Sequence, residues 1–271
     1  MDILCWNIMS GGFNGYDSMA SKPERLDLLV EAIKGVNADF VSLVDTHRWT
    51  EVFTPDDLRG LFGYENVYFV GLNDQRLKVK GHDNGIAVLT RLPITRFETV
   101  RLATRNAIRS VIMNGGKELE IFSVYLDDLS EDTRLRQVMA LLGLIDFAKP
   151  TVFAGDLNTI SASEVPEARE NIEKLFSRYP QARVMEPSLR EMMRGEVIKK
   201  IEERGFVDMG KGAGNTIPSK LSPIPIDRPL LRLDYGFCTK GVVVEGFEVL
   251  REEIFDKVSD HYPIRMKVSL G

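Results

Sequence analysis

The chain has 271 residues, of which 44% are hydrophobic, which is enough for one extended core or for two smaller ones. Its 35 basic and 40 acidic side chains give a net charge of −5, which excludes a general electrostatic attraction to nucleic acid or anionic membranes but leaves a local basic groove open. No apolar stretch approaches the ~20 residues of a membrane span, and the start of the chain lacks a signal-peptide pattern, so we expect a cytoplasmic protein with no membrane partner.

The first part of the chain alternates short apolar runs with polar loops. Residues 3–8 form the first predicted strand, and a stretch rich in Gly, Asn and Ser follows it. Ser21 with Glu24 three residues later has the pattern of a capping box, which predicts a helix that ends at Gly35. Three more apolar runs bounded by turns predict strands at residues 38–44, 67–72 and 85–90.

The middle of the chain shows a hairpin signal followed by helices. Residues 107–113 and 119–126 read as strands separated by Asn114-Gly115, a dipeptide typical of tight hairpin turns, which favours a mixed sheet over a purely parallel one. Apolar residues at helical spacing from 135 to 145 predict a helix, and the apolar run 151–155 predicts the next strand.

The segment 163–204 differs from the rest, because it is rich in Glu, Arg, Lys and Met and is balanced in charge. We interpret it as two or three surface helices inserted into the fold. Strand-like runs resume after it, at residues 231–238, 242–249 and 264–268. Without a linker or an internal repeat, the pattern predicts a single domain over 1–271, with two mixed sheets covered by helices and a helical insert at about 163–204.

Cys5 and Cys238 each lie in an apolar run, without CxxC spacing or a neighbouring His. We interpret them as buried free thiols of a reducing compartment.

Polar residues that could take part in catalysis or metal binding recur at the ends of the predicted strands. They are Asn7, Asp45, Asp156, Asn158, Asp234, Asp260 and His261. Oxygen donors dominate this set, and oxygen donors with a single imidazole suit Mg²⁺ or Mn²⁺ better than Zn²⁺. Hydrolysis of a phosphate ester needs a nucleophilic water, a group that orients it, donors for the developing charge and a cation near the leaving oxygen, and this set could supply all four.

The motifs that carry these residues occur in a specific order. They are Trp6-Asn7-Ile8, an acid after an apolar strand, GIAVLTRLPI at 85–94, GDLN at 155–158, RLDY at 232–235 and SDHYPI at 259–264. Any one of them is weak evidence, but together they resemble the endonuclease/exonuclease/phosphatase superfamily, which has the deoxyribonuclease-I-like fold. The resemblance runs from about residue 2 to residue 268. It implies a four-layer α/β sandwich with the site where the strand-end loops of two packed mixed sheets meet.

The resemblance also implies a role for each residue. Asn7 and Asp45 would hold the metal ion, and Asp260 would support that ion or a second one. Asp156 would orient or deprotonate the attacking water, and Asn158 would hydrogen-bond the phosphate.

His261 would contact the phosphoryl oxygen or act as an acid or base, and Asp234 would keep its imidazole in one tautomer. A carboxylate on one ring nitrogen also raises the imidazole pKa.

Two positions depart from the superfamily pattern. The usual metal-binding acid is Glu, whereas this chain has Asp45, which is one methylene shorter. Tyr125 stands where many members have His, as it does in apurinic-endonuclease-like members, and its phenol could donate to a phosphate oxygen. Arg109 is a further candidate for contact with the substrate phosphate. His47 and His82 lie in polar loops, and we expect them to be solvated, with His82 alternatively lining the cleft, while Trp49 is expected to pack.

The sequence therefore predicts a divalent-metal-dependent phosphodiesterase or phosphatase that acts on a soluble phosphorylated small molecule or nucleotide. A monomer is expected. One alternative is a DNA endonuclease or exonuclease of the apurinic-endonuclease type, which keeps nucleic acid open as a partner. The acidic balance argues mildly against this alternative. Another alternative is a degenerate, non-catalytic phosphate-binding protein, which the departures at Asp45 and Tyr125 motivate.

Overall fold

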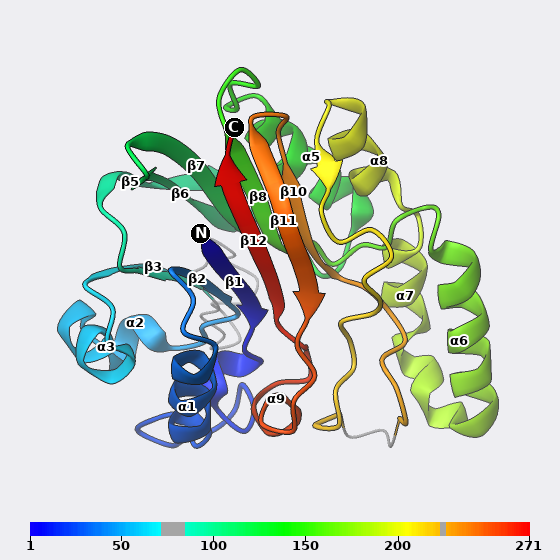
Figure 1. Ribbon diagram of the computed structural model, residues 1–271. Helices are drawn as coiled ribbons and strands as arrows, with labels where there is room; N and C mark the ends of the chain where they lie inside the picture. Colours follow the sequence, from blue (N-terminus) through cyan, green and yellow to red (C-terminus); the bar gives the residue numbers. More distant parts are fainter. Residues whose placement is uncertain (72–84, 223–225) are drawn as a thin grey trace.

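The computed structural model describes residues 1–71, 85–222 and 226–271. In this part of the chain, two six-stranded sheets pack face to face, and helices cover both outer faces (Figure 1). The predicted four-layer α/β sandwich is thus confirmed. The predicted strand 67–72 extends to residue 72, and this residue and His82 lie outside the described residues.

The first sheet has the strand order β11-β12-β1-β2-β4-β3. Its strands are β1 (Asp2–Asn7), β2 (Phe40–Val44), β3 (Asn66–Val70), β4 (Ile86–Thr90), β11 (Val242–Val249) and β12 (Ile264–Leu270). β1 and β2 are parallel, and the remaining neighbours are antiparallel, so the sheet is mixed as predicted.

The second sheet has the order β5-β6-β7-β8-β10-β9. Its strands are β5 (Ile94–Leu102), β6 (Arg105–Asn114), β7 (Lys117–Tyr125), β8 (Thr151–Asp156), β9 (Val207–Asp208) and β10 (Asp234–Cys238). The hairpin predicted at Asn114-Gly115 joins β6 and β7. β7 and β8 form the parallel pair of this sheet. Each sheet therefore has one central parallel pair, and polar residues follow the strands of both pairs.

The helices are α1 (Leu26–Val36), α2 (Trp49–Val52), α3 (Pro55–Phe62), α5 (Glu131–Leu142), α6 (Val165–Arg178), α7 (Glu186–Met192), α8 (Glu196–Glu203) and α9 (Phe255–Val258). The described residues also contain the 3-10 segments η1 (Ser10–Gly12) and η2 (Pro180–Met185). α1, α3 and α9 cover the first sheet, while α5 and α8 cover the second. In the described chain, no helix is both long and apolar enough to cross a bilayer.

Alternation along the strands creates the core between the sheets. Cys5 and Val44 of the first sheet pack against Ile121 and Val152 of the second, whereas Trp6 points the other way and packs on α9. Cys5 is buried here without a disulfide partner, and Cys238 is buried and free as well, as predicted.

The capping box predicted at Ser21 is wrong. α1 begins at Leu26 with Arg25 at its N-cap, and Glu24 instead accepts hydrogen bonds from Ser18 Oγ and the Asn14 backbone N–H. The Glu24 carboxylate therefore binds the preceding loop and does not cap the helix. The local sequence pattern does not reveal this contact.

The predicted insert lies between β8 and β9 and contains α6, η2, α7 and α8. The expectation of surface helices is correct for α6 and α7, which stand at one end of the molecule in Figure 1. It is correct for α8 as well, because its apolar face (Val197, Ile198 and Ile201) is buried against α5 and the second sheet while Lys199 and Glu202 on the other face are exposed.

Candidate active site

Four of the predicted site residues lie at the carboxyl ends of the two parallel strand pairs. Asn7 ends β1 and Asp45 follows β2, while Tyr125 ends β7 and Asp156 ends β8. The amide Nδ2 of Asn7 donates to Asp156 Oδ2 at 2.9 Å, so the ends of the two sheets meet here.

Asp234 and His261 reach the same place from antiparallel neighbours. Asp234 begins β10 directly opposite Asp156, and His261 precedes β12. The hydroxyl of Thr216 accepts the backbone N–H groups of Leu233 and Asp234, at 3.1 and 3.3 Å, and this fixes the start of β10.

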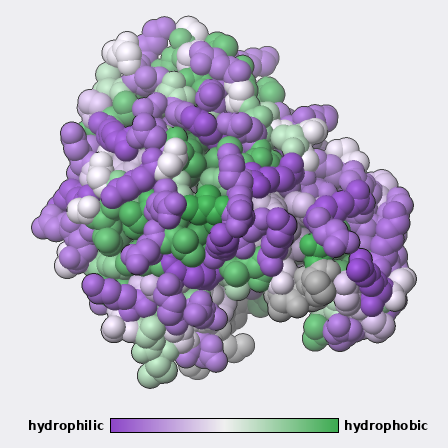
Figure 2. Space-filling view, turned by 60° about the horizontal axis from the view of Figure 1, so that its bottom comes forward, coloured by the Kyte–Doolittle hydropathy of each residue, from purple (hydrophilic) through white to green (hydrophobic). Residues whose placement is uncertain are grey.

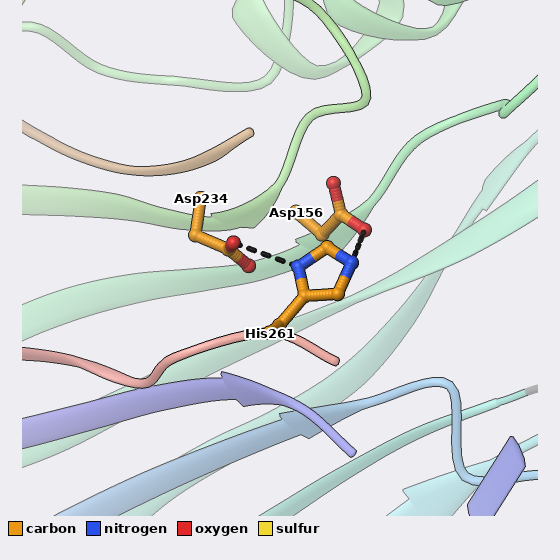
Figure 3. Close-up of side chains that lie close together, drawn as sticks. All are labelled: Asp156, Asp234 and His261. Carbon is orange, nitrogen blue, oxygen red and sulfur yellow. Dashed lines mark hydrogen bonds and ion pairs between the residues drawn. The ribbon is translucent and has the colours of Figure 1, made fainter. Parts of the chain in front are cut away.

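The His261 imidazole lies between two carboxylates (Figure 3). Its Nδ1 is 2.8 Å from Asp234 Oδ2, and its Nε2 is 4.0 Å from Asp156 Oδ2. Burial disfavours the imidazolium, but the adjacent Asp234 and Asp156 carboxylates outweigh it and raise the pKa of His261 to about 10. The two carboxylates therefore favour the cationic form of the ring, and Asp234 fixes which nitrogen faces Asp156.

Asp156 is held by two amide groups. Its Oδ2 accepts from Asn7 Nδ2, and its Oδ1 accepts from the backbone N–H of Asn158 at 2.9 Å. Burial raises its pKa to about 7, and Asp234 adds to the rise while His261 opposes it. A carboxylate whose pKa lies near neutrality is suited to accept a proton from water.

The backbone around Asp156 explains why the GDLN sequence is needed. A Cβ at Gly155 would collide with the Val124 carbonyl of β7, so only glycine allows the two strands to approach this closely. Asn158 has φ of 50°, a left-handed conformation that Asn tolerates better than most residues. One of its amide hydrogens is bound to the Leu126 carbonyl at 3.1 Å, and the second has no hydrogen-bond acceptor among the described residues and could be donated to a ligand.

Asp45 is buried and only partly satisfied. Its Oδ2 accepts the Ser10 backbone N–H and the Tyr16 hydroxyl, both at 2.8 Å, whereas its Oδ1 accepts no hydrogen bond from the described residues. Burial raises the pKa of Asp45, although these two hydrogen bonds oppose the rise. A buried carboxylate oxygen without a donor is costly unless a cation contacts it, so this atom fits a metal ligand.

Ser259 links Asp260 to Asn7. The Ser259 hydroxyl donates to the Asn7 carbonyl at 2.6 Å and lies 3.5 Å from Asp260 Oδ1. Asp260 also acts electrostatically on Asp45 and raises its pKa. Ser259 thus ties Asp260 to the main chain of Asn7, and Asp260 lies near enough to Asp45 to act on its charge.

A second grouping could hold an ion. Ligand atoms of Asp156, Asp234 and His261 lie within 4.8 Å of one another, and all three residues are buried. Because Asp234 already occupies Nδ1 of the imidazole, this trio is better described as a hydrogen-bonded acid–imidazole system. The oxygen-donor set around Asp45 is the stronger candidate for Mg²⁺ or Mn²⁺.

Tyr125 is buried beside these groups. Burial raises the pKa of its phenol well above the ordinary value, and the Asp45 carboxylate raises it further. The Arg105 guanidinium lies 5.3 Å from the centre of the ring. The phenol stays protonated and is therefore a hydrogen-bond donor at physiological pH.

Arg109 lies elsewhere. Its guanidinium binds Glu120 at 2.5 Å and Glu98 at 3.5 Å across β5, β6 and β7, and none of the described contacts connects it to Asp156. Its role in substrate binding stays a prediction. His47 was expected in solvent, and this is wrong, because it is 1% exposed and packs against Phe13 and Tyr16. Trp49 is fully buried, as expected.

Two residues of the site region were missed by the sequence reasoning. Tyr16 donates to Asp45, and it comes from the Gly/Asn/Ser-rich loop, where no periodic pattern marks it. Arg25 is buried and donates to the carbonyls of Met9 and Val258, at 2.7 and 2.5 Å. Arg25 thereby joins the loop after β1 to the loop before β12. It stands among polar residues at the start of α1, so no sequence pattern indicated that its side chain is buried.

Comparisons with known proteins identify the family and the fold of this chain. A sequence model of the Endonuclease/Exonuclease/phosphatase family matches residues 4–261. A comparison with curated protein sequences gave no significant match.

Solved structures with the same architecture cover the whole chain. An endonuclease/exonuclease/phosphatase from Beutenbergia cavernae has a TM-score of 0.74 and 21% identity, with 100% of this chain and 72% of that chain covered. An AP endonuclease from Archaeoglobus fulgidus has a TM-score of 0.67 and 17% identity, with both chains covered over 100%. A mannosyl-6-phosphatase from Bacteroides thetaiotaomicron has a TM-score of 0.64 and 14% identity, again with both chains covered over 100%. At these identities the likeness establishes the fold, the deoxyribonuclease-I-like sandwich.

Proposed function

Because the chain belongs to the endonuclease/exonuclease/phosphatase family, we propose that it is a divalent-metal-dependent hydrolase that cleaves a phosphate ester of a soluble substrate by in-line attack of water. The observation that carries this proposal is the His261 imidazole, which Asp234 holds on one side and which faces Asp156 on the other. Members of the family are usually hydrolases of phosphate esters, and this arrangement is the acid–base system that such chemistry needs.

Asn7 and Asp45 would hold the ion, with Asp260 in support. Asp45 Oδ1 supports this assignment because it is buried and accepts no hydrogen bond from described residues. The side-chain oxygen of Asn7 accepts the Met9 N–H with one lone pair, and its second lone pair could bind the ion. A bound Mg²⁺ or Mn²⁺ would stabilise negative charge on the phosphoryl and leaving oxygens.

The remaining residues would act on water and phosphate directly. Asp156 would orient the attacking water and take its proton, because its pKa is raised towards neutrality. His261, cationic through its raised pKa, would donate from Nε2 to a phosphoryl oxygen. The free amide hydrogen of Asn158 and the Tyr125 phenol would add two neutral donors.

We propose a phosphorylated small molecule or nucleotide as the substrate, and a monomeric, cytoplasmic protein. The net charge of −5 supports this over duplex DNA, which needs a basic face. Cleavage of abasic DNA is the second candidate. The AP endonuclease among the similar structures and the tyrosine at position 125 favour it. A non-catalytic phosphate-binding protein is less consistent with the retained hydrogen-bonded set around Asp156 and His261.

The experiment is an assay of the purified protein with Mg²⁺, Mn²⁺ or EDTA against bis-p-nitrophenyl phosphate, p-nitrophenyl phosphate and abasic duplex DNA. EDTA-sensitive turnover that disappears in Asp156→Asn and in a folded His261→Ala variant is the expected result. The relative rates rank diester, monoester and DNA. Turnover that survives in both variants would contradict the assigned roles, and no turnover with any metal or substrate would favour the non-catalytic alternative.

A further inference from the structure

A pocket of about 550 Å³ lies between the insert and the described residues of 217–222 and 226–231. α6 and α7 form one wall with Leu175, Leu189 and Met192, and Ile217 and Leu231 belong to the opposite wall. This volume falls in the range of small-molecule sites. Figure 2 shows apolar surface beside the indentation that separates the insert from the rest of the molecule.

The pocket is attached to the candidate active site at three points. Leu233 and Asp260, which line it, directly precede Asp234 and His261 in the chain. The Met192 carbonyl accepts the Ile160 N–H at 2.9 Å, so the α7 wall is bonded to the loop that carries Asn158. Because the pocket is held to each of these loops, a ligand in it lies at a fixed position relative to the reacting groups.

The lining decides which part of a substrate fits. Asp260 is the one charged residue among the described residues that line the pocket, and none of the described lining residues is cationic or aromatic. An anionic phosphate would find no cationic partner among the described lining residues, so it fits better on the His261 side, where hydrogen-bond donors lie. A nucleobase would find no ring to stack on. Leu, Ile and Met side chains favour a flexible aliphatic group.

Resting on the function proposed above, we propose that this pocket binds an alkyl group of the substrate, so that the enzyme prefers soluble phosphate esters with an aliphatic chain over sugar phosphates and nucleotides. Asp260 marks the boundary between the apolar pocket and the polar centre. The insert would thus select the organic part of the ester while the strand-end residues act on its phosphorus.

Binding of n-butylphosphonate and n-octylphosphonate by calorimetry tests this proposal without turnover, because their C–P bond resists hydrolysis. Each fully buried methylene strengthens binding by up to about fourfold, so the four extra methylenes of n-octylphosphonate have a ceiling of roughly 250-fold. We expect n-octylphosphonate to bind more than roughly tenfold more tightly than n-butylphosphonate, because the pocket buries only part of the chain. Equal affinities, or no binding of either compound, would overturn the proposal.

Ser188→Phe places a ring into the pocket from α7, and Ser177→Phe is the matched control on the exposed side of α6. The chain-length effect should fall to about threefold or less in Ser188→Phe and persist in Ser177→Phe. If it persists in both, the pocket is not the site. The same proteins assayed with bis-p-nitrophenyl phosphate separate the two proposals: a chain-length effect without turnover would reject the hydrolase alone, and turnover without a chain-length effect would reject the pocket alone.

Discussion

His261 and Asp234 are 27 residues apart in the chain, yet the imidazole Nδ1 lies 2.8 Å from the Asp234 carboxylate. This bond leaves Nε2 as the nitrogen that faces Asp156, at 4.0 Å. A single carboxylate therefore sets both the orientation and the charge of the imidazole.

Replacing Asp234 with Asn tests that relationship. Asp234 favours the imidazolium by charge and by a hydrogen bond, so the His261 pKa should fall from about 10 towards its ordinary value. If protonated His261 is the active form, the lower pKa alone should reduce kcat at pH 7 by about fourfold, and loss of the ring orientation should bring the total to roughly 10². The alkaline limb of the pH–rate profile should move to lower pH. The exposed Asp227→Asn is the matched control and should leave both unchanged. An unshifted limb in Asp234→Asn would show that His261 does not act as an acid.

The stability of the metal-free protein should depend on pH through the same groups. His261 has a folded pKa raised to about 10, so its contribution is complete below its ordinary pKa of 6.5 and is lost as pH rises through about 10. The pKa of Asp156 is raised from 3.8 to about 7, so its contribution to stability is also lost as pH rises, between about pH 4 and pH 7. Urea unfolding in EDTA at several pH values should show that the free energy of unfolding falls as pH rises. In His261→Gln, the free energy of unfolding should fall less steeply with pH above neutrality. A slope unchanged by that substitution would contradict this assignment.

Loss of the Asp45 carboxylate should remove the effect of metal on stability. Mg²⁺ or Mn²⁺ at 100 times its dissociation constant stabilises a folded protein by about 2.7 kcal/mol, which corresponds to a rise in Tm of roughly 5 °C at this size. Asp45→Asn keeps the shape of the side chain but not its charge, so its Tm should respond little to metal. Thermal unfolding with added Mn²⁺ or EDTA measures the difference. A full metal response in Asp45→Asn would place the ion elsewhere, with the Asp156, Asp234 and His261 group as the next candidate.

Most strands and the strand-end residues could be predicted because local patterns determine them. Asn7 and Asp156 each end an apolar strand, and strands of two mixed sheets bring such ends to one edge. Asp234 and His261 also stand at the ends of apolar runs, their pairing was implied by the resemblance, and the contact between them follows from the placement of β10 beside β8 and of β12 beside β1.

The rest depends on tertiary contacts that leave no periodic signal. Tyr16 reaches Asp45 from an irregular loop, and Arg25 is buried because it satisfies backbone carbonyls of two distant loops. His47 looked polar in its local sequence, but aromatic neighbours from another loop bury it.

The hydroxyl of Tyr125 should matter for catalysis more than for stability. The phenol stays protonated because burial raises its pKa, and it ends the strand next to Asp156. In Tyr125→Phe the packing surface is retained, so kcat should fall by roughly 10-fold while the free energy of unfolding changes by less than about 1.5 kcal/mol. Steady-state kinetics and urea unfolding of the same preparation separate the two effects. An unchanged kcat would assign the tyrosine to packing alone.

The fully buried pair Glu131 and Arg134 supports the loop that follows Asn158. Arg134 Nε donates to Glu131 Oε2 at 2.7 Å, and Glu131 Oε1 accepts from the Thr159 hydroxyl at 3.1 Å and from the Val197 N–H at 3.0 Å. Glu131→Gln or Arg134→Met leaves an uncompensated buried charge, so each should cost about 3 to 5 kcal/mol of unfolding free energy.

The double variant removes both charges together, and its cost should therefore be smaller than the sum of the two single variants by at least roughly 1 kcal/mol. Urea unfolding of the four proteins in this cycle gives the coupling directly. Additive costs would mean that the pair stabilises the loop through separate hydrogen bonds and not through the ion pair.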